Sequence, residues 1–149
     1  GEAGVFELDF DKGMAEHADH VVFNGRNGAL TGDGALKATA GDKVRIYFGN
    51  IGPNSASSFH IIGEIFDTVY VEGSLGGAVN RNVQTTLVPS AGSTIVEFKI
   101  DVPGNYLLVD HSIFRVAKGA VGIIAAEGKD NPAIFKKVKG GSDASGSGH

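Results

Sequence analysis

The chain has 149 residues, and it contains no cysteine and no tryptophan. The absence of cysteine excludes disulfides, thiolate metal sites and a nucleophilic thiol. No apolar run approaches the roughly 18–20 residues that a helix needs to cross a bilayer. The formal net charge is −4 and no basic patch is present, which argues against nucleic acid as a partner. The chain begins at Gly1 without a methionine or a signal peptide, so we expect a mature, processed or excised segment.

Glycine, in contrast, is abundant, with 23 residues, which is about 15% against a usual ~7%. It separates short apolar segments, a pattern typical of strands joined by tight turns. In one of these segments Val44, Ile46 and Phe48 share a face. About eight short strands without a long helix predict an antiparallel sandwich or Greek-key barrel. The strands are expected at 20–25, two within 35–50, one or two within 57–73, and at 83–88, 94–100, 105–110 and 119–128.

The two ends of the chain differ from this pattern. Residues 1–18 predict a linker and a short helix, with Asp11 as a plausible cap. Residues 19–139 form the expected domain. It closes with a short helix at 131–138 that Asn131 would cap. Residues 140–149 are expected to be a flexible tail.

Two of the histidines, His17 and His20, lie in a polar setting, and we expect them to be ordinary surface residues. His60 lies in an almost wholly apolar strand. If that strand is extended, His60 and Ile62 point to one side, and the residues between and before them point to the other. Taken alone, His60 is best explained as a core histidine with satisfied hydrogen bonds, because buried polar groups are usually paired.

The segment NYLLVDHSIFR, residues 105–115, ends its apolar run with Asp110 and His111. The pair is either hydrogen-bonded at a strand end, or it includes a metal ligand on a rigid strand. Asp110 should point away from His111, so the two would not chelate one ion. Imidazole suits copper or zinc, but a firm site needs about three protein ligands. Spacing alone does not join His60 to His111.

Four long motifs occur in one order: HVVFNGRNGALTGDGALKATAGDKVRIYFGNIGPN, SSFHIIGEIFDTVYVEG, NVQTTLVP and VPGNYLLVDHSIFR. Over about residues 19–135 they resemble the second cupredoxin domain of copper-containing nitrite reductases. The resemblance implies an all-β, cupredoxin-like Greek-key β-sandwich. It also implies a periplasmic or otherwise extracytoplasmic homotrimer of two-domain subunits that reduces nitrite to nitric oxide in denitrification. In this family a type 1 copper lies in the first domain, and a type 2 copper lies between subunits.

The resemblance also implies roles for individual residues. His111 matches the type 2 copper ligand that the second domain supplies to a neighbouring subunit, and His60 matches the proton-relay histidine. Ile62 matches the aliphatic residue that packs over the copper and shapes nitrite binding. Gln84 and Thr85 match positions that orient the relay histidine.

Counted from the Pro-Gly that precedes the last motif, Asp110 occupies the position of the type 1 copper cysteine. The resemblance therefore implies no type 1 copper in this chain and a structural role for Asp110. The first domain, its type 1 copper and two of the three type 2 ligands would come from elsewhere. We expect the isolated chain to be inactive and a complete enzyme that contains it to be active.

Two alternatives remain at this point. The chain could be a redox-silent cupredoxin module that serves trimer assembly or partner binding. It could also be one chain of a split enzyme, in which another polypeptide supplies the domain with the copper cysteine.

Overall fold

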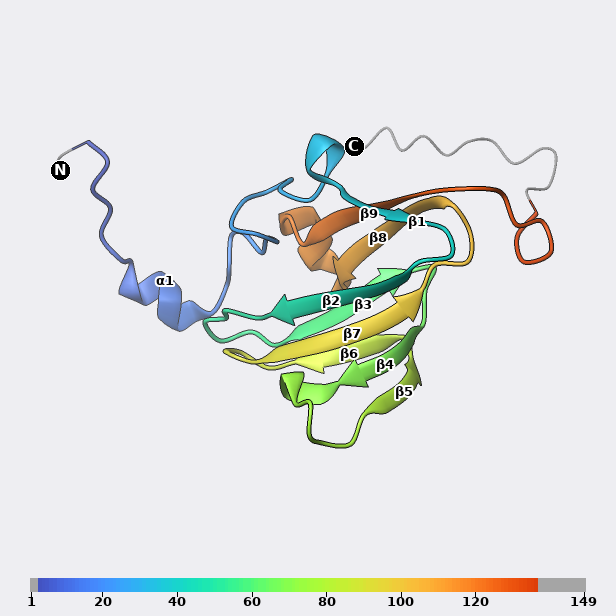
Figure 1. The fold of residues 1–149 in the computed structure, drawn as a ribbon. Helices are drawn as coiled ribbons and strands as arrows, with labels where there is room; N and C mark the ends of the chain where they lie inside the picture. Colours follow the sequence, from blue (N-terminus) through green and yellow to red (C-terminus); the bar gives the residue numbers. More distant parts are fainter. Residues whose placement is uncertain (1–2, 137–149) are drawn as a thin grey trace.

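The computed structural model describes residues 3–136, and in this part of the chain nine strands form two packed sheets (Figure 1). The five-stranded sheet has the order β1-β9-β8-β3-β6, and the four-stranded sheet has the order β2-β7-β4-β5. The predicted all-β sandwich is confirmed. The strands are β1 Leu36–Thr39, β2 Lys43–Gly49, β3 Ser57–Ile62, β4 Phe66–Tyr70, β5 Asn80–Val83, β6 Thr85–Val88, β7 Ser93–Lys99, β8 Gly104–Asp110 and β9 Val121–Glu127.

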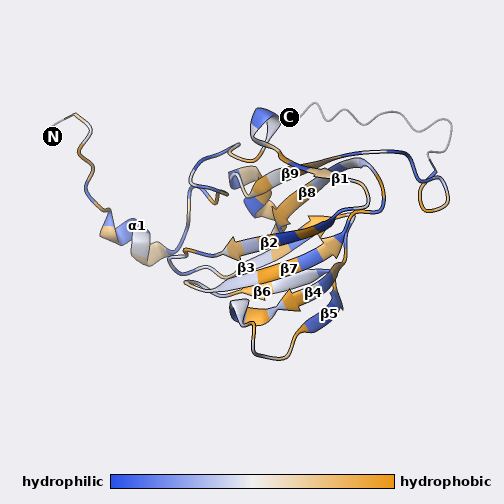
Figure 2. Ribbon diagram, viewed as in Figure 1, coloured by the Kyte–Doolittle hydropathy of each residue, from blue (hydrophilic) through white to orange (hydrophobic). Residues whose placement is uncertain are grey.

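The hydrophobic core fills the space between the two sheets. Phe59, Phe66 and Phe98 are fully buried there, and each such side chain contributes about 1.5–3 kcal/mol. Phe59 stacks on Phe48 with 4.2 Å between ring centroids. Along β2 every second residue turns inward, which confirms the face predicted for this strand. Figure 2 shows this alternation of hydrophobic and hydrophilic residues along the strands.

The strand predicted at 83–88 is two strands in the structure. It divides at Gln84, and β5 pairs with β4 in one sheet while β6 pairs with β3 in the other. The alternation shifts by one residue at the division: Val83 is partly buried in β5, whereas Thr86 and Val88 are the buried residues of β6. Another difference is the pairing of β1 with β9, which is parallel in an otherwise antiparallel sandwich.

The segment at residues 20–25, predicted as a strand, has no regular structure. It runs along η3 (Ile113–Lys118), a 3-10 helix that the sequence pattern did not predict. Val21 N donates to Lys118 O at 3.1 Å. The main-chain groups of this segment thus bond to a helix end instead of a sheet ladder. Two more short 3-10 helices, η1 Gly32–Gly34 and η2 Val71–Gly73, lie in connections.

At the N-terminal end, α1 (Phe10–Ala15) matches the predicted short helix, but its cap is Asp9 rather than Asp11. The Asp9 carboxylate accepts from Lys12 N at 2.9 Å. In Figure 1, α1 stands away from the sandwich on an extended arm. The apolar side chains of this arm are exposed: Val5, Phe6, Leu8, Phe10 and Met14.

At the C-terminal end, the helix predicted at 131–138 is a single turn in the part that the structure describes. Ile134 N and Phe135 N both donate to Asn131 O, and no longer helix follows through residue 136. Residues 137–138 and the tail predicted at 140–149 lie outside the described residues. Within residues 3–136, the helices are too short and too polar to cross a membrane.

Candidate metal centre

The pairing of β3 with β8 brings two histidines together. His60 lies opposite Val109 in this antiparallel pair, and His111 directly follows the last residue of β8. His111 N donates to Ser58 O at 2.8 Å, which continues the ladder by one bond. The imidazole rings of His60 and His111 meet edge to face with their centroids 5.2 Å apart. The sheet register therefore joins two residues that their spacing in the sequence could not join.

The His60 ring is fixed through one nitrogen. Its Nδ1 lies 2.6 Å from Gln84 O, the carbonyl at the point where β5 ends and β6 begins. Because a carbonyl only accepts, Nδ1 carries the proton in this hydrogen bond. Thr85 Oγ1 is a more distant neighbour, 3.4 Å from the same nitrogen. This geometry leaves Nε2 as the nitrogen that can accept or release a proton.

His60 is not a core residue. Phe59 and Ile61, its neighbours along β3, are fully buried, whereas His60 is partly exposed on the opposite face of the sheet. The interpretation of His60 as a core histidine is therefore wrong for its location, although the ring does have a hydrogen-bond partner. Alternation along the strand places Ile62 on the same face, with 43% of its surface exposed.

Asp110 points into the protein on the opposite side from His111. Its carboxylate is buried, and it accepts from Ser112 N at 2.9 Å, from Ser58 N at 3.2 Å and from Arg115 Nη1 at 2.7 Å. Burial alone would raise its pKa, but these hydrogen bonds hold the pKa of Asp110 below its usual range. Asp110 and His111 do not face a common ion, as the alternation of the strand predicted.

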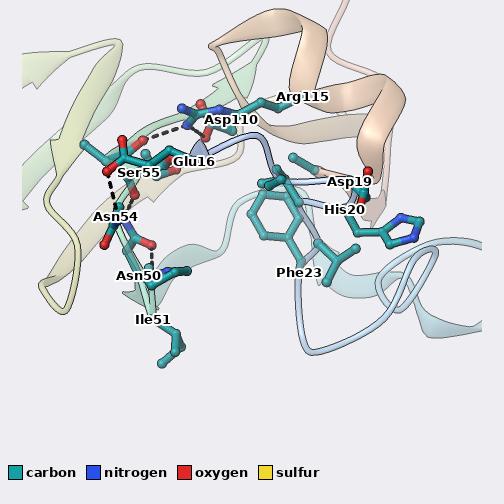
Figure 3. Close-up of a pocket in the computed structure, with 18 of the residues that line it drawn as sticks. Glu16, Asp19, His20, Phe23, Asn50, Ile51, Asn54, Ser55, Asp110 and Arg115 are labelled. Atoms are coloured by element: carbon teal, nitrogen blue, oxygen red, sulfur yellow. Dashed lines mark hydrogen bonds and ion pairs between the residues drawn. The ribbon is translucent and has the colours of Figure 1, made fainter. Parts of the chain in front are cut away.

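Arg115 is a residue of this region that the sequence pattern did not indicate. The only signal in the sequence is a basic residue a few positions after a buried carboxylate, in a segment without predicted structure. A 3-10 helix brings its guanidinium back to the end of β8. Figure 3 shows Asp110 and Arg115 facing each other, joined by a dashed line.

The Asp110–Arg115 pair lines an open cleft of about 890 Å³ between the N-terminal segment and the sandwich (Figure 3). Loop residues such as Asn50 and Asn54 form another side of this cleft. The lining includes neither His60 nor His111. The two histidines therefore lie on the open face of the five-stranded sheet, and the cleft lies on the other side of the same strand end.

The described residues do not form a complete metal site. Within residues 3–136, no group of three or more histidine, cysteine, aspartate or glutamate side chains could hold an ion. His17 and His20 are exposed, as predicted. The pair of His60 and His111 offers imidazole nitrogens, which suit copper. These residues fit a shared copper site that takes its remaining ligands from another domain or chain.

This sandwich of two sheets, with an imidazole pair at the end of β8, defines a cupredoxin-like domain. The multicopper oxidase family model matches residues 5–129, and the chain belongs to this family. The chain is 60% identical over 136 residues to a copper-containing nitrite reductase of Neisseria meningitidis serogroup B, covering 91% of this chain and 34% of that protein. It is 56% identical to a copper-containing nitrite reductase of Neisseria gonorrhoeae, covering 99% of this chain and 38% of the relative.

A solved copper nitrite reductase of Nitrosomonas europaea has the same fold. It superimposes with a TM-score of 0.74 at 32% identity, covering 83% of this chain and 45% of that one. The chain spans about a third of the length of the curated relatives it matches, and it corresponds to their C-terminal part. The resemblance seen in the motifs is thus confirmed, and copper is the metal implied by the family.

Proposed function

We propose that this chain is the type-2-copper half of a copper nitrite reductase that reduces nitrite to nitric oxide. In this proposal His111 contributes one copper ligand and His60 relays protons. The observation that carries the proposal is the contact of the two rings at 5.2 Å on an open sheet face. A ligand and a proton donor for one small anion must lie this close together.

His60 has the chemistry that a proton relay requires. Reduction of nitrite to nitric oxide and water consumes one electron and two protons. An imidazole nitrogen can both take up and release a proton, which suits it to general acid–base work. The bond from Nδ1 to Gln84 O orients the ring. Nε2 is then the atom that exchanges protons. Gln84 thus acts through its main-chain oxygen, and Thr85 supports the ring through its hydroxyl.

His111 is held through its main chain, so its exposed ring can bind copper without moving the strand. Bound copper would supply the electron and bind the nitrite. Ile62 supplies an apolar wall on the same face, which would limit water and restrict the orientation of a bound anion.

The surface around the histidines supports a shared site. On the same face of the sheet, Leu87 and Leu107 are 68% and 37% exposed. Apolar surface of this kind beside polar functional groups is typical of a surface that a partner covers. We therefore propose that a first cupredoxin domain with a type 1 copper completes the enzyme, in a homotrimer. A periplasmic or otherwise extracytoplasmic location remains a prediction.

The test is nitrite reduction by the full-length protein that contains this chain. His60→Ala should retain copper but lose roughly 10²–10⁴-fold in kcat, the usual effect of removing a proton-transfer group, and its pH–rate profile should lose one limb. His111→Ala should lose activity together with copper. His17→Ala, which changes an exposed histidine, is the matched control and should keep full activity. Near-normal nitrite reduction in both site variants would contradict the proposal and favour a redox-silent module.

A further inference from the structure

The Asp110 carboxylate joins three segments around the end of β8. It accepts from Ser58 N, near the start of β3, and from Ser112 N, in the turn after β8. It also accepts from Arg115 Nη1, in η3. The same nitrogen of Arg115 donates to Ala56 O at 2.7 Å, one residue before β3. The bond from Ser58 N ties the end of β8 directly to the strand that carries His60, and Arg115 links it through η3 to the residue before that strand.

His111 lies inside this set of bonds. Asp110 precedes it, and Ser112, whose N–H bonds to the Asp110 carboxylate, follows it. The N–H of His111 itself donates to Ser58 O. Asp110 and His111 are therefore bonded to β3, and Ser112 is bonded back to Asp110. Rotation of this short stretch would carry the His111 ring away from His60, and it would have to break at least one of these bonds.

We propose that Asp110, held by Arg115, is a positioning residue that fixes the His111 ring relative to His60. It touches neither ring and acts through the main chain of residues 110–112. The inference that Asp110 places the His111 ring depends only on the structure. Its consequence for copper rests on the proposed function. The substitution that tests this positioning role most sharply keeps the shape of the Asp110 side chain and alters only its hydrogen bonding.

Asp110→Asn is that change. Three N–H donors converge on the carboxylate, which only accepts, and an amide must turn its own N–H₂ toward at least one of them. A buried donor that faces a donor costs free energy, so the stretch around His111 should shift to relieve it. Groups that orient a metal ligand typically contribute about 10–100-fold to metal affinity.

The experiment uses the full-length protein in two forms. In the copper-loaded form, Asp110→Asn should weaken the affinity of the type 2 copper by about 10–100-fold in a chelator competition. It should also alter the paramagnetic resonance signal of that copper. In the metal-free form with isotope-labelled histidine, nuclear magnetic resonance should show contact between the His60 and His111 rings in the wild type. This contact should be lost or weakened in the variant.

Glu97→Gln is the matched control. The Glu97 side chain is 5% exposed and pairs with Arg45 and Lys43, but it lies on β7 in the other sheet. Both substitutions remove the charge of a buried, cation-paired carboxylate, so both should lower the melting temperature. Only Asp110→Asn should change copper affinity and the ring contact. Equal copper effects in the two variants would overturn the positioning role.

A second pair of variants covers the case in which Asp110→Asn does not fold. Arg115→Ala leaves the two main-chain donors on Asp110, and it should weaken copper affinity less than Asp110→Asn. Arg115→Lys keeps a cation for Asp110 and should restore part of the loss. Wild-type copper affinity and ring contact in Asp110→Asn, or in Arg115→Ala if only that variant folds, would overturn the inference. If the ring contact depends on Asp110 in the metal-free form, but the copper-loaded full-length protein holds no copper at His111, only the proposed function would be overturned.

Discussion

At the scale of single residues, the site depends on where the two histidine rings lie and on which nitrogen of His60 is free. The strand pattern predicted that His60 and Ile62 share a face, and it predicted that Asp110 turns away from His111. Both placements follow from alternation and are found in the structure. The bond from His60 to Gln84 O could not be predicted from the pattern, because it depends on where the chain changes sheets. The roles of the five site residues themselves remain predictions.

Glu64, in the turn after β3, provides a prediction about pH. Burial and the nearby charge of Asp101 raise its pKa to about 7, although a hydrogen bond from Tyr106 opposes the shift. The folded protein therefore holds this proton more tightly than the unfolded chain does. The associated stability is present below pH ~4.5 and is lost as the pH rises through about 7.

Glu64→Gln mimics the protonated group, so it should remove this loss. We expect little change in melting temperature at pH 4.5 and a clear increase relative to wild type at pH 8. Thermal unfolding across this range measures the difference. Glu127→Gln, at an exposed position, serves as the control. A melting-temperature difference for Glu64→Gln that is constant with pH would show that Glu64 titrates normally in the folded state.

At the scale of elements, the strands were predicted best where one apolar segment corresponds to one strand, as in β2, β7 and β8. The prediction failed where one apolar segment contains a boundary between strands. Residues 83–88 belong to two sheets, and the inward-facing positions shift from Val83 in β5 to Thr86 and Val88 in β6. Residues 20–25 are apolar because they pack beside η3, and the segment bonds to the end of that helix instead of joining a sheet. A local sequence pattern indicates which residues are buried, but it does not indicate which element of the fold buries them.

Gly119 shows how closely that segment approaches η3. It ends η3 with φ at +111°, and a Cβ atom there would lie 2.9 Å from Val22 Cγ1. Gly119→Ala should lose about 1–3 kcal/mol from backbone strain alone, and more from the contact with Val22. Chemical denaturation measures the loss.

Gly25→Ala is the matched control, because Gly25 also has a positive φ, at +81°, but has open space around it. Gly25→Ala should lose stability from backbone strain alone, without the additional loss from a contact such as that with Val22. If the two variants lose equal stability, the close approach of the N-terminal segment to η3 does not occur in solution.

At the scale of the whole molecule, the site is incomplete within the described residues, and the chain spans only about a third of its curated relatives. Two imidazoles are too few ligands to close a firm copper site. The purified chain should therefore take up copper weakly. It should show no intense thiolate-to-copper absorption, because it has no cysteine. A copper titration followed by absorption and metal analysis tests both expectations. A tight stoichiometric complex would mean that copies of this chain assemble a full ligand set by themselves.

In the proposed enzyme the remaining ligands belong to surfaces that meet this chain from outside, so they could not be predicted from this sequence in physical terms. This chain contributes two imidazoles that β3 and β8 hold in place. His111 is exposed at the end of β8, and the carbonyl of Gln84 orients the ring of His60 beside it. The central claim is that His111 binds a shared type 2 copper.

The measurement that tests this claim is paramagnetic resonance with copper analysis on the full-length protein carrying His111→Ala. We predict that the type 2 copper signal disappears while the type 1 copper of the other domain stays at full occupancy. His20→Ala, which changes an exposed histidine of the same chain, should keep both signals. A His111→Ala protein that folds normally and retains its full type 2 copper would contradict the account.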